Sequence, residues 1–162
     1  MTRPAGEPAL TQDPTRRDWL AVLARAPRQD LEQRSGRIAE GVAFEWLREP
    51  ETGLAMVRAR IGNSGDRFNV GEATVTRCVV RHRGGDGAVS AGVGYVLGRD
   101  PERARWVAQA DALLQQPRHR AAVLAELIEP LRRAAGARDA AEAARTATSR
   151  VRFYTLAPEV AA

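Results

Sequence analysis

The sequence contains no lysine, so all 25 Lys/Arg positions are arginine. This absence excludes a P-loop, whose lysine contacts nucleotide phosphates. Together with the abundance of alanine, it favours a GC-rich genome at least as much as a selected nucleic-acid surface. The formal charge of +5 is therefore weak evidence for DNA or RNA binding, and we expect no nucleic-acid partner.

Cysteine is also nearly absent, because Cys78 is the only one. One cysteine excludes an internal disulfide and any cysteine-based zinc or iron–sulfur site made by this chain alone. Cys78 lies in the run TVTRCVV, where a small buried apolar side chain fits best. His82 and His119 are far apart in sequence and have no carboxylate at ligand spacing, which is more typical of surface or capping histidines than of metal ligands.

No apolar run approaches the roughly 18 residues needed to span a bilayer, and the N-terminus lacks the apolar core of a signal peptide. We therefore expect a cytoplasmic protein without a membrane partner. The 162 residues, 44% of them hydrophobic and 28% charged, suit one globular domain. Residues 1–14 lack periodicity and are expected to be disordered, which leaves residues 15–162 as a single domain.

Helical periodicity marks both ends of that domain. Residues 15–26 and 29–39 predict the N-terminal helices, with Gly41 as a stop. Later, Asp100 is a good N-cap before a further helix, and Pro117 can open another. Pro130 predicts a kink or break, and Gly136 with Asp139 predicts a stop and restart that continues to about residue 149.

Strand patterns fill the middle of the chain, over residues 42–48, 54–61, 73–83 and 91–97. The run GGDG at 84–87 predicts a hairpin turn, and in residues 54–61 we expect Ala55, Val57, Ala59 and Ile61 to form the core face. Residues 151–158 are expected to be extended, either completing the sheet or reaching a partner. The predicted fold class is α+β, an antiparallel sheet of about four or five strands with helices at the N-terminal and C-terminal ends.

Residues 51–81 are the most informative part of the chain, since polar and apolar side chains are mixed on both faces of the expected strands. Such a pattern suits a sheet whose second face meets an anionic ligand or another protein. The candidate ligand- or partner-binding residues are Arg58, Arg60, Asn69, Glu72, Thr74 and Arg77.

Arginines in this stretch also suggest an anion site. If the strands pair, the guanidinium groups of Arg58, Arg60, Arg67 and Arg77 could converge near the glycine-rich connection. Arginine forks match phosphate and phosphonate oxygens, and glycine amides could add an anion nest. The alternative, in which these arginines pair with carboxylates of this chain or a neighbour, is slightly favoured.

No motif identifies a complete active site. The glycines of GVGYVLG at 92–98 do not fit the dinucleotide fingerprint, and Ser64 lacks the nucleophile-elbow spacing. Glu72 and Asp111 could act as acid–base groups, but a structural role is favoured for each. We therefore assign no catalytic residue and no metal ligand.

Several separated motifs, taken in order, resemble the PhnG subunit of the bacterial carbon–phosphorus lyase system. They are RRDWLAVLARA at 16–26, ETGLAMVRARIGNSGDRFNVGEATVTRCVVR at 51–81, GYVLGRD at 94–100, ADALLQQPRH at 110–119, IEPL at 128–131 and SRVRFYT at 149–155. The resemblance extends from about Arg16 to Thr155.

The resemblance implies a subunit that assembles with PhnH, PhnI and PhnJ. In that pathway methylphosphonate displaces adenine from the ribose C1 of ATP, so ATP would be a substrate of the complex rather than a cofactor of this chain. The nucleosidase-like centre is expected on PhnI and the iron–sulfur cluster on PhnJ. This chain would then support the reaction without a catalytic residue of its own. The alternative is a stand-alone domain that binds or processes a phosphonate or nucleotide on an arginine-rich sheet.

Overall fold

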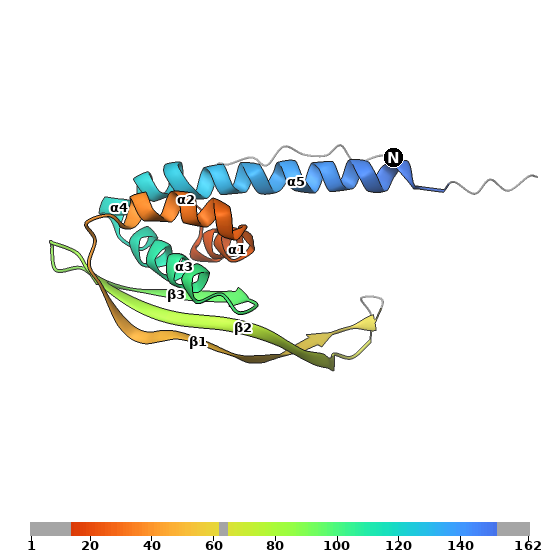
Figure 1. The fold of residues 1–162 in the computed structure, drawn as a ribbon, viewed down its shortest axis with the longest axis horizontal. Coiled ribbons are helices and arrows are strands. Elements are labelled where there is room, and N and C mark those ends of the chain that lie inside the picture. Colours follow the sequence, from red (N-terminus) through yellow and green to blue (C-terminus); the bar gives the residue numbers. More distant parts are fainter. Residues whose placement is uncertain (1–13, 62–64, 152–162) are drawn as a thin grey trace, which may run out of the picture.

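The computed structural model describes residues 14–61 and 65–151, and these form an α+β fold (Figure 1). The expected disorder of residues 1–14 falls almost entirely outside the described residues. The elements in chain order are α1 Arg16–Arg25, α2 Arg28–Ala39, β1 Phe44–Ala59, β2 Phe68–Arg83, β3 Val89–Leu97, α3 Pro101–Leu114, α4 Pro117–Val123, the π-helical turn η2 Leu124–Ile128, and α5 Glu129–Thr148.

The elements form three layers. The bottom layer is an antiparallel sheet in the order β1-β2-β3, the middle layer contains α1, α2 and α3, and α5 runs across the top (Figure 1). Helix α3 contacts β3 and β2 below it and α1 and α2 beside it, while α1 contacts α5 above. The buried core lies between the sheet and these helices.

Two glycines of β3 let α3 lie directly on the sheet. A Cβ atom on Gly92 would lie 1.9 Å from the carbonyl oxygen of Ala108, and one on Gly94 would lie 1.9 Å from that of Ala104. No side chain fits at such distances, and α3 presents alanines there, so the two backbones meet closely.

Helix α3 is much shorter than the strands that it covers. Its 14 residues extend about 21 Å, whereas the 16 residues of β1 or β2 extend about 53 Å. The middle layer therefore covers only one end of the β1–β2 hairpin. The other end projects from the core, alongside the projecting half of α5 (Figure 1).

The buried side chain of Asp111 links three elements through hydrogen bonds. Its carboxylate is fully buried and accepts hydrogen bonds from the Nε and Nη2 of Arg16, at 3.1 and 2.7 Å, and from the indole Nε1 of Trp19 at 2.9 Å. It also accepts the backbone N–H of Val93, at 2.9 Å, on the free edge of β3. The favoured structural role of Asp111 agrees with this geometry, since its oxygens are used in linking α1, α3 and β3.

The sheet has three strands in the described residues, rather than the four or five that the sequence predicts. The expected strands 42–48 and 54–61 form one strand, because Pro50 lies in a bulge between Arg48 and Glu51 where two residues oppose one. The expected extended segment 151–158 lies outside the described residues, apart from Val151. The hairpin turn at 84–87 is confirmed, with Gly87 at φ +82°.

The predicted starts of the helices are confirmed better than their ends. Thr15 and Asp18 form a capping box at α1, and Asp100 accepts the N–H of Arg103 at α3. The predicted stop at Gly136 is wrong, because α5 continues to Thr148. Pro130 does not break the helix, since η2 immediately before it gives a wider turn and Pro130 lies in the first turn of α5.

The two histidines lie side by side, contrary to the surface position that the sequence predicts for both. His82 is 94% buried, its Nδ1–H donates to the carbonyl of Ala43, and its ring meets the edge of His119 at a centroid distance of 5.7 Å. Cys78 is buried as expected, and burial raises the pKa of its thiol to about 11. It is therefore a packing residue rather than a nucleophile.

We predict that Asp111→Ala destabilises the fold by about 3 kcal/mol, because the buried donors of Trp19 and Val93 lose their acceptor. Pulse proteolysis of dilute protein across a urea series would measure the change. Asp139→Ala, on the exposed part of α5, should change stability by less than about 0.5 kcal/mol. Equal effects of the two substitutions would contradict the linking role of Asp111.

The free energy of unfolding should also decrease as the pH is lowered, because of His119. Burial, and secondarily the nearby His82 and Arg118, lower the pKa of His119 below its ordinary value of 6.5. As pH falls through 6.5 the unfolded chain takes up this proton first, so stability decreases until the lower folded pKa is passed. His119→Gln should flatten this part of the urea-midpoint profile, and an unchanged slope would contradict the assignment.

Candidate interaction surface

All six predicted binding residues lie on the projecting β1–β2 hairpin or just beside it. Arg58 faces Asn69 across the ladder, Glu72 faces Met56, and Thr74 faces Leu54. Arg60 follows the last residue of β1, and Arg77 lies nearer the core, opposite Glu51. Thr74 is half-buried and the other five are exposed.

These residues divide between the two faces of the hairpin. Strand alternation places Glu72 and Thr74 on the same face as Thr76, Cys78 and Val80, which α3 covers. We call this the inner face of the hairpin. Thr76 itself is structural: its hydroxyl donates to the carbonyl of Gly98 at 2.6 Å and accepts the N–H of Asp100 at 3.1 Å.

The outer face carries Arg77, whereas Arg58, which alternates with Met56 along β1, lies on the inner face with its ladder partner Asn69. The register shift opposite Val57 and Arg58 places an extra residue, Val70, in β2 and interrupts the alternation of that strand. The prediction of a core face formed by Ala55, Val57, Ala59 and Ile61 is wrong. Val57 and Ile61 are 43% and 77% exposed, because no helix reaches this part of the sheet.

The arginines do not all converge. Arg77 donates from Nε to Glu51 at 2.6 Å, and this bond, with Arg48 nearby, lowers the pKa of the Glu51 carboxyl. Eight residues separate Arg77 from Asn69 along β2, which corresponds to about 26 Å. The pairing alternative is therefore confirmed for Arg77, and convergence of Arg77 with the others is wrong.

Three other arginines do share the far end of the hairpin. Arg58 and Arg60 lie at the end of β1, and Arg67 lies just before β2. Within residues 14–61 and 65–151, no ion pair joins any of the three to a carboxylate. The predicted glycine nest draws on the connection bracketed by Gly62, Gly65 and Gly71, of which residues 62–64 lie outside the described residues.

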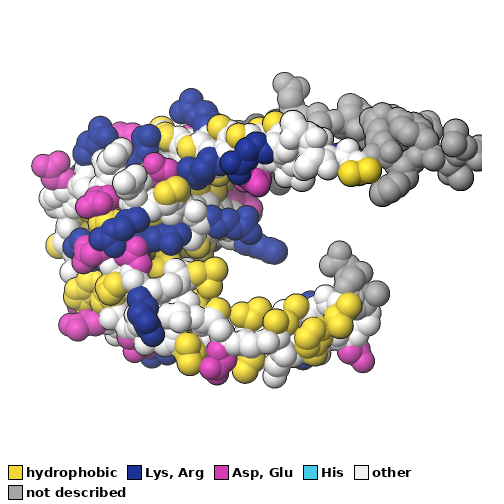
Figure 2. Space-filling view, turned by 45° about the vertical axis from the view of Figure 1, so that its right-hand side comes forward, with side chains coloured by type: hydrophobic (Ala, Val, Ile, Leu, Met, Phe, Trp, Pro, Cys, Tyr) yellow, Lys and Arg dark blue, Asp and Glu magenta, His cyan; other side chains and the backbone are white. Residues whose placement is uncertain are grey.

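Exposed apolar residues of the projecting hairpin are the part of this surface that the sequence prediction missed. Leu54 and Met56 on β1 and Phe68 and Val70 on β2 are 63%, 53%, 45% and 58% exposed. Hydrophobic side chains gather on the lower projecting arm in Figure 2. The signal was present in the sequence, since Leu54 and Met56 alternate with the residues of the predicted core face.

Helix α5 forms a second projecting arm. Every residue from Gly136 to Thr148 is exposed, whereas Leu131 nearer the core is buried. Figure 2 shows an open hollow between this arm and the hairpin arm. The described part of the molecule is therefore C-shaped, and its two arms leave large surfaces without a covering layer.

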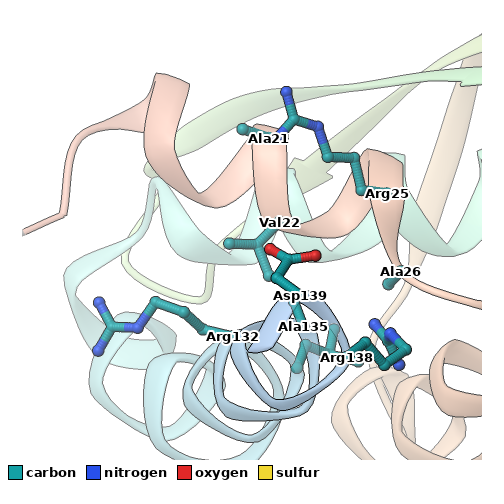
Figure 3. A pocket seen from close by; sticks show the side chains of 9 residues that line it. Ala21, Val22, Arg25, Ala26, Arg132, Ala135, Arg138 and Asp139 are labelled. Carbon is teal, nitrogen blue, oxygen red and sulfur yellow. The ribbon is translucent and has the colours of Figure 1, made fainter. Parts of the chain in front are cut away.

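A cavity of about 260 Å³ lies where α5 crosses α1, and several arginines line it. In Figure 3 the side chains of Arg25, Arg132 and Arg138 point in different directions, while Asp139 points toward Val22. Arg132 is paired with Glu129, and Arg138 with Asp30. The arrangement does not gather positive charge, so this cavity is a poor anion site.

The described ranges contain neither a metal-binding cluster nor a helix suited to cross a membrane. There, no three His, Cys, Asp or Glu side chains gather closely enough to hold a metal ion. None of the helices there combines the length and the hydropathy needed to cross a membrane. The projecting hairpin is the strongest candidate for a functional surface.

Comparison with known proteins gives this surface a context. The family model described as phosphonate metabolism protein PhnG matches residues 14–158. A protein of Rhizobium meliloti (strain 1021), the alpha-D-ribose 1-methylphosphonate 5-triphosphate synthase subunit PhnG, is 43% identical over 141 residues, which are 87% of each chain. The chain therefore belongs to the PhnG family of phosphonate metabolism proteins.

Proposed function

We propose that this chain is a supporting subunit of an assembly that transfers methylphosphonate onto the ribose C1 of ATP with release of adenine. The relative from Rhizobium meliloti is named as a subunit of a synthase, which supports membership of a multi-subunit enzyme. The reaction itself follows from the family resemblance rather than from any group of side chains in this chain.

The single observation that supports a subunit role is the uncovered hairpin. Soluble monomers seldom expose contiguous apolar surface beyond a few hundred Å². Here Leu54, Met56, Phe68 and Val70 lie exposed at the far end of the hairpin, and Leu54 and Met56 share a sheet face that is buried nearer the core. A partner that covers this face would remove the apolar side chains from water and complete the core, as in obligate interfaces.

The partners in this proposal are PhnH, PhnI and PhnJ, and the assembly works in the cytoplasm. ATP is a substrate of the complex, and this chain needs no cofactor of its own. The carboxylates weighed for acid–base chemistry support a non-catalytic role. Asp111 is committed to four core hydrogen bonds, and Glu72 is exposed beside the apolar patch.

A second function is favoured by one specific observation. Arg58, Arg60 and Arg67 share the far end of the hairpin without a carboxylate partner in the described residues. Guanidinium groups placed together in this way can hold phosphate or phosphonate oxygens. The stand-alone alternative is thus an anion-binding domain that uses these arginines.

The subunit role predicts that the chain alone releases no adenine from ATP and methylphosphonate, whereas the assembly co-expressed with PhnH, PhnI and PhnJ does. Chromatographic detection of adenine and native mass measurement of the assembly would check this. Omitting the chain from the co-expression should reduce adenine release at least a hundredfold. Turnover by the isolated chain, or full turnover without it, would overturn the proposal.

Calorimetry of the isolated chain with ATP and with methylphosphonate distinguishes the anion-binding alternative from the subunit role. If the chain is only a scaffold, neither ligand should give measurable heat at millimolar concentration. Binding that is lost in Arg60→Ala and kept in Arg83→Ala, at the opposite end of the hairpin, would establish the anion-binding function instead.

A further inference from the structure

We propose that the hollow between the hairpin arm and the α5 arm holds an amphipathic α-helix of a partner subunit. This inference rests on the proposed subunit role and deepens it, because it specifies the kind of element that the chain binds. The helix would occupy the space that continues the middle layer, with its apolar side on the hairpin and a polar side toward α5.

The thickness of the hollow favours a helix. In the core, α1 contacts both β3 and α5, so one helix separates the sheet from α5 there (Figure 1). Helices pack about 8–10 Å apart, and a helix sits about 10 Å above a sheet. The two arms continue the outer layers on either side of an open space (Figure 2), so that space has room for about one helix.

The hairpin arm provides an apolar surface on which such a helix could pack. Leu54 and Met56 continue the sheet face on which α3 lies, beyond the point where α3 begins, and the exposed Phe68 and Val70 lie in the adjacent strand at and beyond its register shift. A strand added to the free edge of β1 would leave these side chains in water, because an edge strand pairs with backbone groups only. A helix laid across the face would bury them.

The α5 arm supplies charge on the opposite side. The face of α5 that meets α1 contains Leu131 and Ala135, and helical periodicity continues it through Asp139, Glu142 and Thr146. Arg138 and Arg145 lie on the same side of the helix, so this side presents two carboxylates and two guanidinium groups in line with the middle layer. Glu142 pairs with the exposed Arg145, whereas Asp139 has no cationic partner within the described residues. A partner helix with charged and polar side chains on its upper side would complement the stripe.

A matched pair of substitutions tests whether the inner face of the hairpin arm binds the partner helix. Met56→Asp places a charge on the inner face, and Val57→Asp places the same charge on the outer face one residue away, where exposure is similar at 53% and 43%. In the co-expressed assembly, Met56→Asp should weaken retention of this chain at least tenfold. Val57→Asp should leave retention within about twofold of the unmodified chain.

A charge-matched pair tests the α5 side. Glu142→Lys should weaken the assembly several-fold at low salt, because it reverses a charge on the side of α5 that would meet the partner helix. The double variant Ala137→Lys/Ala144→Lys changes the charge by the same amount on the opposite side of α5 and should have little effect. Equal effects of these variants would contradict the proposed orientation of the helix.

A photo-crosslinking amino acid at position 56 identifies the occupant directly. Digestion and mass analysis should find it joined to a segment of another subunit with apolar residues at helical spacing. Crosslinks to residues 152–162, to a second copy of this chain or to no other segment would overturn the inference. Failure of the unmodified chains to assemble would instead overturn the proposed function, so the two failures are distinguishable.

Discussion

The contact of α3 with β3 determines the shape of this protein. Gly92 and Gly94 remove the side chains that would hold the helix away from the strand, and Asp111 joins the same helix to α1 and to the edge of β3. The contact fixes where the middle layer lies and also where it ends. Because α3 is about 21 Å long and the two long strands about 53 Å, the end of the hairpin beyond Thr74 has no helix above it. The exposed inner face follows from that mismatch rather than from any special feature of the hairpin.

Local signals in the sequence predict local structure well. The capping residues Thr15 and Asp100 mark helix starts correctly, and the glycines at 84–87 mark the hairpin turn. The errors concern properties that depend on neighbours in space. Pro50 looks like the end of a strand, but a bulge in the ladder accommodates it, and Gly136 is tolerated because α5 is already nucleated by the packed turns before it. The meeting of His82 with His119 depends on the fold and has no sequence signature.

The same distinction between local signals and properties that depend on the fold applies to the candidate site. The sequence correctly singles out the segment 51–81 as unusual, because its polarity fits neither a core strand nor an ordinary surface strand. It does not show which face of that segment is the inner one. Alternation alone favours Ala55 and Val57 as a core face, yet their ladder partners are on the outer face, and Leu54 and Met56 share the helix side. The arginines were predicted as binding residues because they are numerous in this segment. The exposed apolar side chains provide the stronger physical reason for binding, since their exposure to water is unfavourable.

Membership of the PhnG family and an incomplete middle layer lead to one account, in which this chain is a component whose core is completed by another subunit. Met56 offers the most direct test, because it is the only methionine in the described residues and lies 53% exposed on the inner face. Dilute peroxide oxidises exposed methionine thioethers, and peptide mass analysis measures the rate at this residue. The account predicts that Met56 oxidises at least tenfold more slowly in the assembly than in the isolated chain. The same rate in both would show that the inner face stays open to water and would contradict the account.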